Sequence, residues 1–191
     1  MSELFGLLFT SLIVNNVILT QFLGMCPFMG VSKKRTSALG MGVAVVFVIV
    51  AASIITFGLY YLVLVPLKLE FMDLITFILV IASLVQLTEM FIKKTSPALY
   101  KSLGVYLPLI TTNCVVLNVC LVNIQNGYDF AHMIMYSVGT PMGFALVLYI
   151  FSTIRERLEL SDVPEFFKGN PIALVVAAIM SMAFTCFAGV I

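Results

Sequence analysis

Six apolar runs, each about as long as a membrane span, make up most of this 191-residue sequence. A helix that crosses the hydrocarbon core of a bilayer needs about 20 apolar residues. The runs are continuously apolar rather than alternating, which indicates helices and not the strands of a β-barrel. They cover approximately residues 4–30, 38–65, 71–92, 99–124, 130–153 and 171–190. We therefore expect an all-α integral membrane protein with six transmembrane helices.

The composition supports this class and excludes several others. Hydrophobic residues make up 62% of the chain, charged residues make up 10%, and the mean hydropathy is +1.16. A soluble domain is roughly 45–50% apolar and about 25% charged. The net charge of +1 offers no basic patch for nucleic acid. These values exclude a soluble enzyme, a disordered tail and a nucleic-acid-binding protein, and six spans leave a single membrane domain over residues 1–191.

The basic residues indicate how the spans are oriented. Nine of the ten lie in the loops after the first, third and fifth runs: Lys33, Lys34, Arg35, Lys93, Lys94, Lys101, Arg155, Arg157 and Lys168. The positive-inside rule places these loops in the cytoplasm, so both termini are expected on the outer side. The N-terminal segment has no Lys or Arg, unlike a signal peptide, so the first run is expected to stay as a span.

The first and fourth runs contain helix-breaking and polar residues near their middle. The first has Asn15 and Asn16 and then Gly-Met-Cys-Pro at 24–27, and the fourth has Pro108 and then Thr-Thr-Asn-Cys at 111–114. Proline removes a backbone hydrogen bond and clashes with the preceding turn. Non-helical backbone at membrane depth persists only where it is buried in protein or lines a cavity. We expect helices 1 and 4 to be interrupted.

The interruptions open the two halves of the chain, about 1–97 and 98–191. Because each half has three spans, the second would enter the membrane from the opposite side, as an inverted 3+3 repeat. Residues 42–47 loosely echo residues 143–148, although any two apolar runs look alike. Interrupted helices in matching positions of two halves point to a binding site at the repeat interface.

Cys26 and Cys114 stand beside the two breaks, one in each half. Thiolates bind zinc and iron–sulfur clusters, but two ligands are too few for either. A buried cysteine can equally behave as a small hydrophobic residue, and the sequence leaves both interpretations open. Cys120 would lie roughly 120° from Cys114 around a helix, and Cys186 has no breaker nearby, so both are expected to be packing residues. Any cluster would need two thiolates from another protein chain.

Several asparagines lie within the apolar runs. Asn113, beside Cys114, is a candidate hydrogen-bond donor to cluster sulfurs. Asn118 and Asn123 are expected to make bonds between helices, which are common in membrane bundles.

Two strings of the sequence resemble the A subunits of Rnf complexes. They are FLGMCPFMGVSKK at residues 22–34 and LPLITTNC at residues 107–114. Further matches are QLTEM at 86–90, KTSP at 94–97 and IRERL at 154–158. The resemblance covers the whole chain. The related E subunit of the sodium-pumping NADH:quinone reductase is less similar at Cys-Pro-Phe-Met-Gly.

The resemblance implies one component of a membrane-bound oxidoreductase that couples electron flow between ferredoxin and NAD to movement of Na⁺ or H⁺. It implies an inverted pair with a similar E subunit, beside the B, C, D and G subunits, in a bacterial or archaeal inner membrane. The pair is understood to hold one [2Fe–2S] cluster, and the motifs map its ligands in this chain onto Cys26 and Cys114. No activity is expected of the chain alone.

Two other functions fit the pattern of spans. Inverted repeats with broken helices also occur in secondary transporters of small solutes, although the breaks here carry no clear substrate-binding charge. A purely structural role within a membrane complex is the third possibility.

Overall fold

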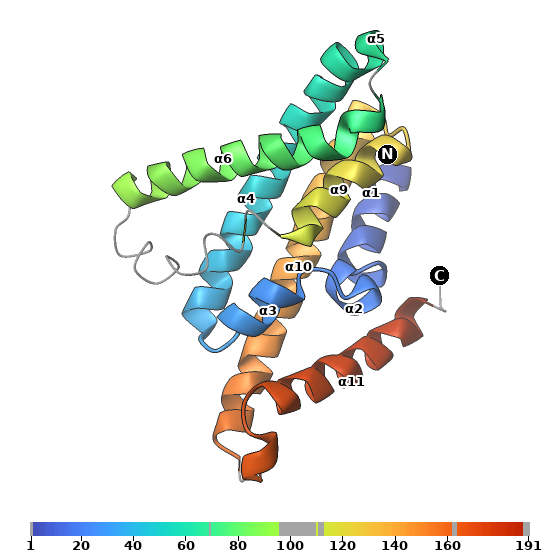
Figure 1. The fold of residues 1–191 in the computed structure, drawn as a ribbon. Coiled ribbons are helices and arrows are strands. Elements are labelled where there is room, and N and C mark those ends of the chain that lie inside the picture. Colours follow the sequence, from blue (N-terminus) through green and yellow to red (C-terminus); the bar gives the residue numbers. More distant parts are fainter. Residues whose placement is uncertain (1, 69, 96–109, 111–112, 162–163, 189–191) are drawn as a thin grey trace.

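The computed structural model describes residues 2–68, 70–95, 110, 113–161 and 164–188. Within these ranges every regular element is helical. Figure 1 shows α4 (Arg35–Leu59) and α10 (Phe130–Glu159) side by side, α6 (Asp73–Thr95) packed across α4, and α11 (Asn170–Ala188) at the opposite end. The expected all-α class is confirmed.

The first apolar run is interrupted twice, as its breakers predict. It consists of α1 (Ser2–Phe9), a π-helical turn η1 (Thr10–Val14), α2 (Val17–Gln21) and α3 (Met25–Val31). The first interruption lies at Asn15 and Asn16, and the Asn16 side chain caps α2 by accepting a hydrogen bond from the Ile18 N–H at 3.2 Å. At the second interruption Phe22 and Gly24 adopt left-handed backbone angles, with φ of 55° and 78°.

The other described elements are mostly long helices. They are α4 (Arg35–Leu59), η2 (Tyr60–Leu64), α5 (Val65–Leu67), η3 (Glu70–Met72), α6 (Asp73–Thr95), α9 (Cys114–Gln125), α10 (Phe130–Glu159), η4 (Glu165–Phe167) and α11 (Asn170–Ala188). By length and composition, three described stretches could each cross a membrane: Arg35–Leu67, Asp73–Phe91 and Phe130–Glu159. Shorter apolar helices cover Leu4–Val14, Cys114–Gln125 and Asn170–Cys186. Residues 96–109 and 111–112 lie outside the described ranges, so the break in run four and the six-span inverted repeat stay predictions.

The helix α10 is longer than its apolar run. It continues to Glu159 rather than ending near residue 153. Arginine and glutamate have high helix propensity, so a helix can go on past the apolar span when its end is charged. Glu156 on this extension forms an ion pair with Arg35 at the start of α4. The helix thus extends beyond its apolar run by a charged end.

The core lies where α4, α9 and α10 meet the pieces of the first run (Figure 1). The fully buried side chains include Met41 and Ile49 of α4 and Phe144 and Leu148 of α10. Phe28 of α3 stacks on Phe151 of α10 with ring centroids 4.1 Å apart. This packing holds α3, which carries Cys26, against the long helix α10.

An apolar stripe faces outward from α4. Leu39, Val43, Phe47 and Ile54 are all exposed, at 45–64% of their full surface. They recur at helical spacing on one face. A contiguous exposed apolar face of this kind is typical of contact with lipid or with another membrane chain.

Candidate functional site

The structure brings together the two helix starts that carry the predicted cysteines. α3 begins at Met25, so Cys26 lies in its first turn, and Cys114 is the first residue of α9. The backbone N–H of Gly24 donates a hydrogen bond to Cys114 Sγ at 3.0 Å, across 90 positions of sequence. In Figure 1 the start of α9 faces α3. Cys114 therefore lies against Gly24, two positions before Cys26.

Gly24 is the residue on which this arrangement depends. Its φ of +78° lies in the left-handed region, which only glycine adopts at no steric cost. A Cβ at this position would lie 2.8 Å from Phe144 Cε2 and 2.8 Å from Val115 Cγ2. The backbone before α3 thus approaches the start of α9 more closely than any side chain would allow.

Both cysteines lie where a helix leaves backbone donors free. The first N–H groups of a helix have no partner within it, and they give its start a partial positive charge. Pro27 lies in the first turn of α3, where it has no helical hydrogen bond to remove. Asn113 caps α9 by accepting a hydrogen bond from the Val115 N–H at 3.1 Å. Such termini stabilise negative charge on sulfur.

The four cysteines differ in exposure. Cys26 and Cys114 are both exposed, whereas Cys120 is buried at 1% exposure on α9. The prediction that Cys120 is a packing residue is confirmed. The same prediction for Cys186 is wrong for this chain, because Cys186 is exposed on α11, where its thiol bonds to the Met182 carbonyl. Helix α11 has fewer neighbours at that end than its apolar sequence suggests.

The donor set at the site fits half of an iron–sulfur centre. Four thiolates hold an all-cysteine [2Fe–2S] cluster, and hydrogen bonds to sulfur tune its potential. Among the described residues no group of three or more His, Cys, Asp and Glu side chains could hold a metal ion. Besides two exposed thiols, the site offers the Gly24 N–H and the Asn113 Nδ2, which is buried without a hydrogen-bond partner in the described structure. Such a cluster fits here only if another chain supplies the remaining ligands.

Asn118 and Asn123, which were both predicted to form hydrogen bonds between helices, differ in the structure. Asn123 of α9 donates a hydrogen bond from Nδ2 to Ser137 Oγ of α10 at 2.9 Å, so its predicted role between helices is confirmed. The buried Nδ2 of Asn118 has no hydrogen-bond partner among the described residues, so its predicted bond between helices is not seen there.

Sequence reasoning missed a residue that holds α3 from the other end. Arg155 served only as an orientation signal, but its Nη1 donates to the Met29 carbonyl at 2.7 Å and to Ser32 Oγ at 2.8 Å. These bonds cap the C-terminal end of α3, where a cation is favourable. An arginine just beyond an apolar run was the available signal, but its partners lie more than 120 positions away and no local pattern reveals them.

The comparison with known families agrees with the sequence strings. A family model described as Rnf-Nqr subunit, membrane protein, matches residues 4–191. The chain belongs to the Rnf-Nqr family. That membership agrees with the apolar helices described above and confirms the family resemblance of the two cysteine strings.

Similar proteins match this Rnf-Nqr chain over nearly its whole length. One is the A subunit of the Na⁺-translocating ferredoxin:NAD⁺ oxidoreductase complex of Acetobacterium woodii, 55% identical over 96% of this chain and 95% of its own. The A subunit of the ion-translocating oxidoreductase complex of Syntrophotalea carbinolica is 51% identical, and that of Shewanella oneidensis is 50% identical. Each of these two matches covers 100% of this chain and at least 99% of the relative's own length.

Proposed function

We propose that this protein is the A subunit of an Rnf-type ion-translocating ferredoxin:NAD⁺ oxidoreductase. We further propose that it carries electrons across the membrane through a [2Fe–2S] cluster shared with a homologous protein of the same complex. The names of its full-length relatives support the complex and the place of this chain within it. Of the two coupling ions, Na⁺ is named for the relative from Acetobacterium woodii; for this chain either Na⁺ or H⁺ fits the proposal.

The observation that carries the cluster proposal is the hydrogen bond from Gly24 to Cys114 Sγ. It places the thiol of one half against the backbone that leads to Cys26 of the other half. Both thiols remain exposed, as ligands shared with a second chain must be. A packing cysteine would instead be buried, as Cys120 is.

The depth of the membrane explains why such a site is useful. The hydrocarbon core is about 30 Å thick, and electron tunnelling falls steeply with distance, so a crossing needs an intermediate station. When bound, a cluster takes up and releases one electron. This chain's residues would hold it with two thiolates, orient Cys114 through the Gly24 N–H, and supply amide donors in place of water.

The partner that we propose is the homologous E subunit, paired with this chain in inverted orientation. It would supply the other two thiolates from its own helix breaks. The B, C, D and G subunits would complete the complex in the bilayer.

We also propose that the protein lies in the inner membrane of its cell with both termini on the outer side. The nine basic residues after the odd-numbered spans support this orientation. A reporter that functions only outside the cytoplasm, fused after Ile191, should be active. Activity of a cytoplasmic reporter at the same position would overturn the assignment.

The transporter alternative has less support. The first apolar run has no Asp, Glu, Lys, Arg or His between Leu4 and Ser32. Its breaks therefore offer thiols, amides and hydroxyls but no charge to bind an ionic solute.

Substitution of each cysteine in the intact complex tests the proposal. Cys26→Ala and Cys114→Ala should each abolish the bound cluster and ferredoxin-driven NAD⁺ reduction. Cys120→Ala and Cys186→Ala, as matched controls, should retain both. Loss of the cluster in Cys120→Ala, with its retention in Cys114→Ala, would show that the ligand assignment is wrong.

A further inference from the structure

The guanidinium of Arg155 is a buried charge whose described partners are all neutral. Arg155 is 5% exposed. Besides its bonds to Met29 and Ser32, its Nη2 donates to Asn170 Oδ1 at 3.2 Å. Among the described residues no carboxylate forms an ion pair with it. A buried charge without a counter-charge is costly, so this position favours an anion.

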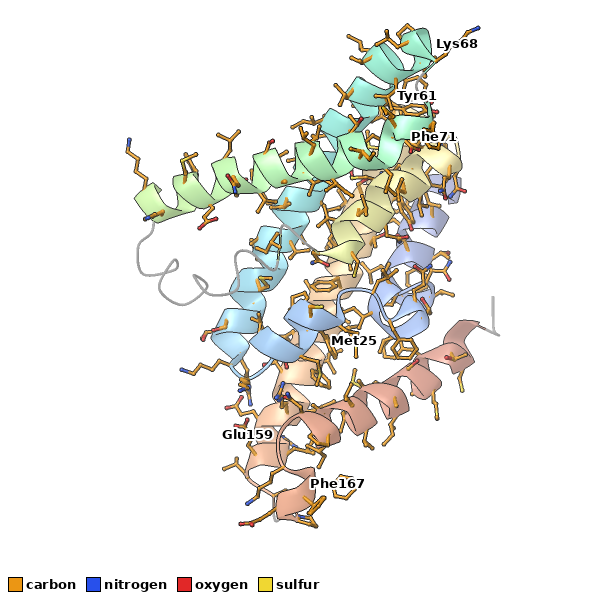
Figure 2. All side chains as sticks on the ribbon, in the orientation of Figure 1. Met25, Tyr61, Lys68, Phe71, Glu159 and Phe167 are labelled. Carbon is orange, nitrogen blue, oxygen red and sulfur yellow. The ribbon has the colours of Figure 1, made fainter. Side chains whose placement is uncertain are left out.

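A cavity of about 180 Å³ opens beside Arg155, between the end of α10 and the start of α11. Its lining consists of Arg155, Leu158, Glu159, Lys168, Gly169 and Ile172. Two cations face one carboxylate, which leaves a net positive charge. Gly169 directly precedes the 19-residue helix α11 and Ile172 lies in its first turn, so the positive end of that helix also borders the cavity. Figure 2 labels Glu159 and Phe167 at this end of the molecule.

An apolar groove continues from this cavity between α10 and α11. It shares Arg155, Leu158 and Ile172 with the cavity. Its other walls are the apolar side chains of Phe151, Ile154, Ala173 and Val176. This groove holds only about 10 Å³, too little for an acyl chain, but Leu174 and Val175 beside it on α11 are about half exposed. A charged cavity next to an exposed apolar helix face fits a ligand with a charged head and a hydrocarbon tail.

We propose that this site binds one anionic phospholipid, with its phosphate against Arg155 and Lys168 and its acyl chains against the exposed apolar face of α11. Charge complementarity selects an anion, and the adjoining apolar face selects a lipid over a free phosphate ion. The site lies at the end of α10 where the basic residues predict the cytoplasmic side. The cytoplasmic leaflet carries anionic lipids, and basic pockets between helices on that side bind their head groups. This inference does not depend on the proposed redox function.

The sequence permits a direct optical test, because the chain contains no tryptophan. Phe167→Trp, an aromatic replacement at an exposed position next to Lys168, would place a single tryptophan beside the site. The full-length chain would be placed in phosphatidylcholine bilayers with a minor fraction of brominated phosphatidylglycerol or brominated phosphatidylcholine. Bromine quenches tryptophan at short range, and we expect the brominated phosphatidylglycerol to quench more strongly.

Charge variants in the Phe167→Trp background decide whether the cavity causes the preference for brominated phosphatidylglycerol. Lys168→Ala should weaken the preference about fivefold, since one basic residue near anionic lipid contributes about 1 kcal/mol. Glu159→Gln should strengthen it, because it removes the one carboxylate among the lining residues. Lys94→Ala is the matched control, since Lys94 is an exposed lysine at the end of α6 that does not line the cavity, and it should have no effect.

Three results would overturn the proposal. Equal quenching by the two brominated lipids would show no selection for an anion. An equal effect of Lys94→Ala and Lys168→Ala would show a diffuse surface attraction instead of a site. Removal of the preference by inorganic phosphate would show a site for a free anion, with no role for the lipid tail.

Discussion

Cys114 and Cys120 lie on the same helix, α9, yet their surroundings differ in every respect that matters for binding a metal centre. Cys114 is the first residue of the helix, exposed, and accepts a hydrogen bond from the Gly24 N–H. Cys120 lies in the middle of the helix and is buried at 1% exposure, where the neighbouring amides are used by the helix itself. The comparison teaches that the start of the helix, and not the cysteine alone, creates the candidate site.

The largest loss of the cluster at the Cys114 site is expected from Gly24→Ala. The new Cβ would collide with Phe144 and Val115, so the N–H of residue 24 could no longer reach Cys114 Sγ. We expect most of the cluster to be lost, as measured by iron content of the purified complex. Gly127→Ala is the matched control: Gly127 also has a positive φ, of +58°, but a Cβ there would meet nothing within 4 Å.

The control separates steric collision from backbone strain. A non-glycine residue in the left-handed region costs roughly 1–2 kcal/mol, and both variants carry this cost. Iron content that falls equally in the two variants would contradict the role given to the close approach of Gly24.

A smaller effect is expected from the two asparagine caps. Asn16→Ala and Asn113→Ala each remove the side-chain acceptor at the start of a helix, at a cost of about 0.5–2 kcal/mol. Only Asn113 adjoins a thiol and has a buried Nδ2 without a described partner. We therefore expect only Asn113→Ala to lower the midpoint potential of the cluster, because a lost donor destabilises the more negative, reduced form.

A redox titration of the cluster in each variant measures this difference. Equal potentials in Asn16→Ala and Asn113→Ala would mean that the Asn113 amide does not act on the cluster. Both variants should lower thermal stability to a similar extent, which checks that each cap has been removed.

The local features of the site could be predicted from the sequence. Breakers in the first apolar run predicted the interruptions before α2 and α3 and singled out Cys26. The breakers of the fourth run singled out Cys114 at the start of α9. These inferences need only the backbone chemistry of asparagine, glycine and proline within an apolar segment.

The contacts that join distant segments could not be predicted in this way. The bond from Gly24 to Cys114 and the bonds from Arg155 to α3 connect positions about 90 to 126 apart, and no local pattern specifies them. The prediction for Cys186 was wrong for the same reason, since hydropathy cannot tell a face packed within the chain from one that remains exposed. The first half of run four lies outside the described residues and its break is still a prediction.

The central claim is that this chain supplies half of a shared cluster. Electron paramagnetic resonance of the dithionite-reduced protein tests it most directly, with this chain alone, its proposed partner alone, and the purified pair. The account predicts a [2Fe–2S] signal from the pair and none from either chain alone, since this chain brings only Cys26 and Cys114 to the site. A cluster signal from this chain alone, or a correctly assembled pair without any iron, would contradict the account.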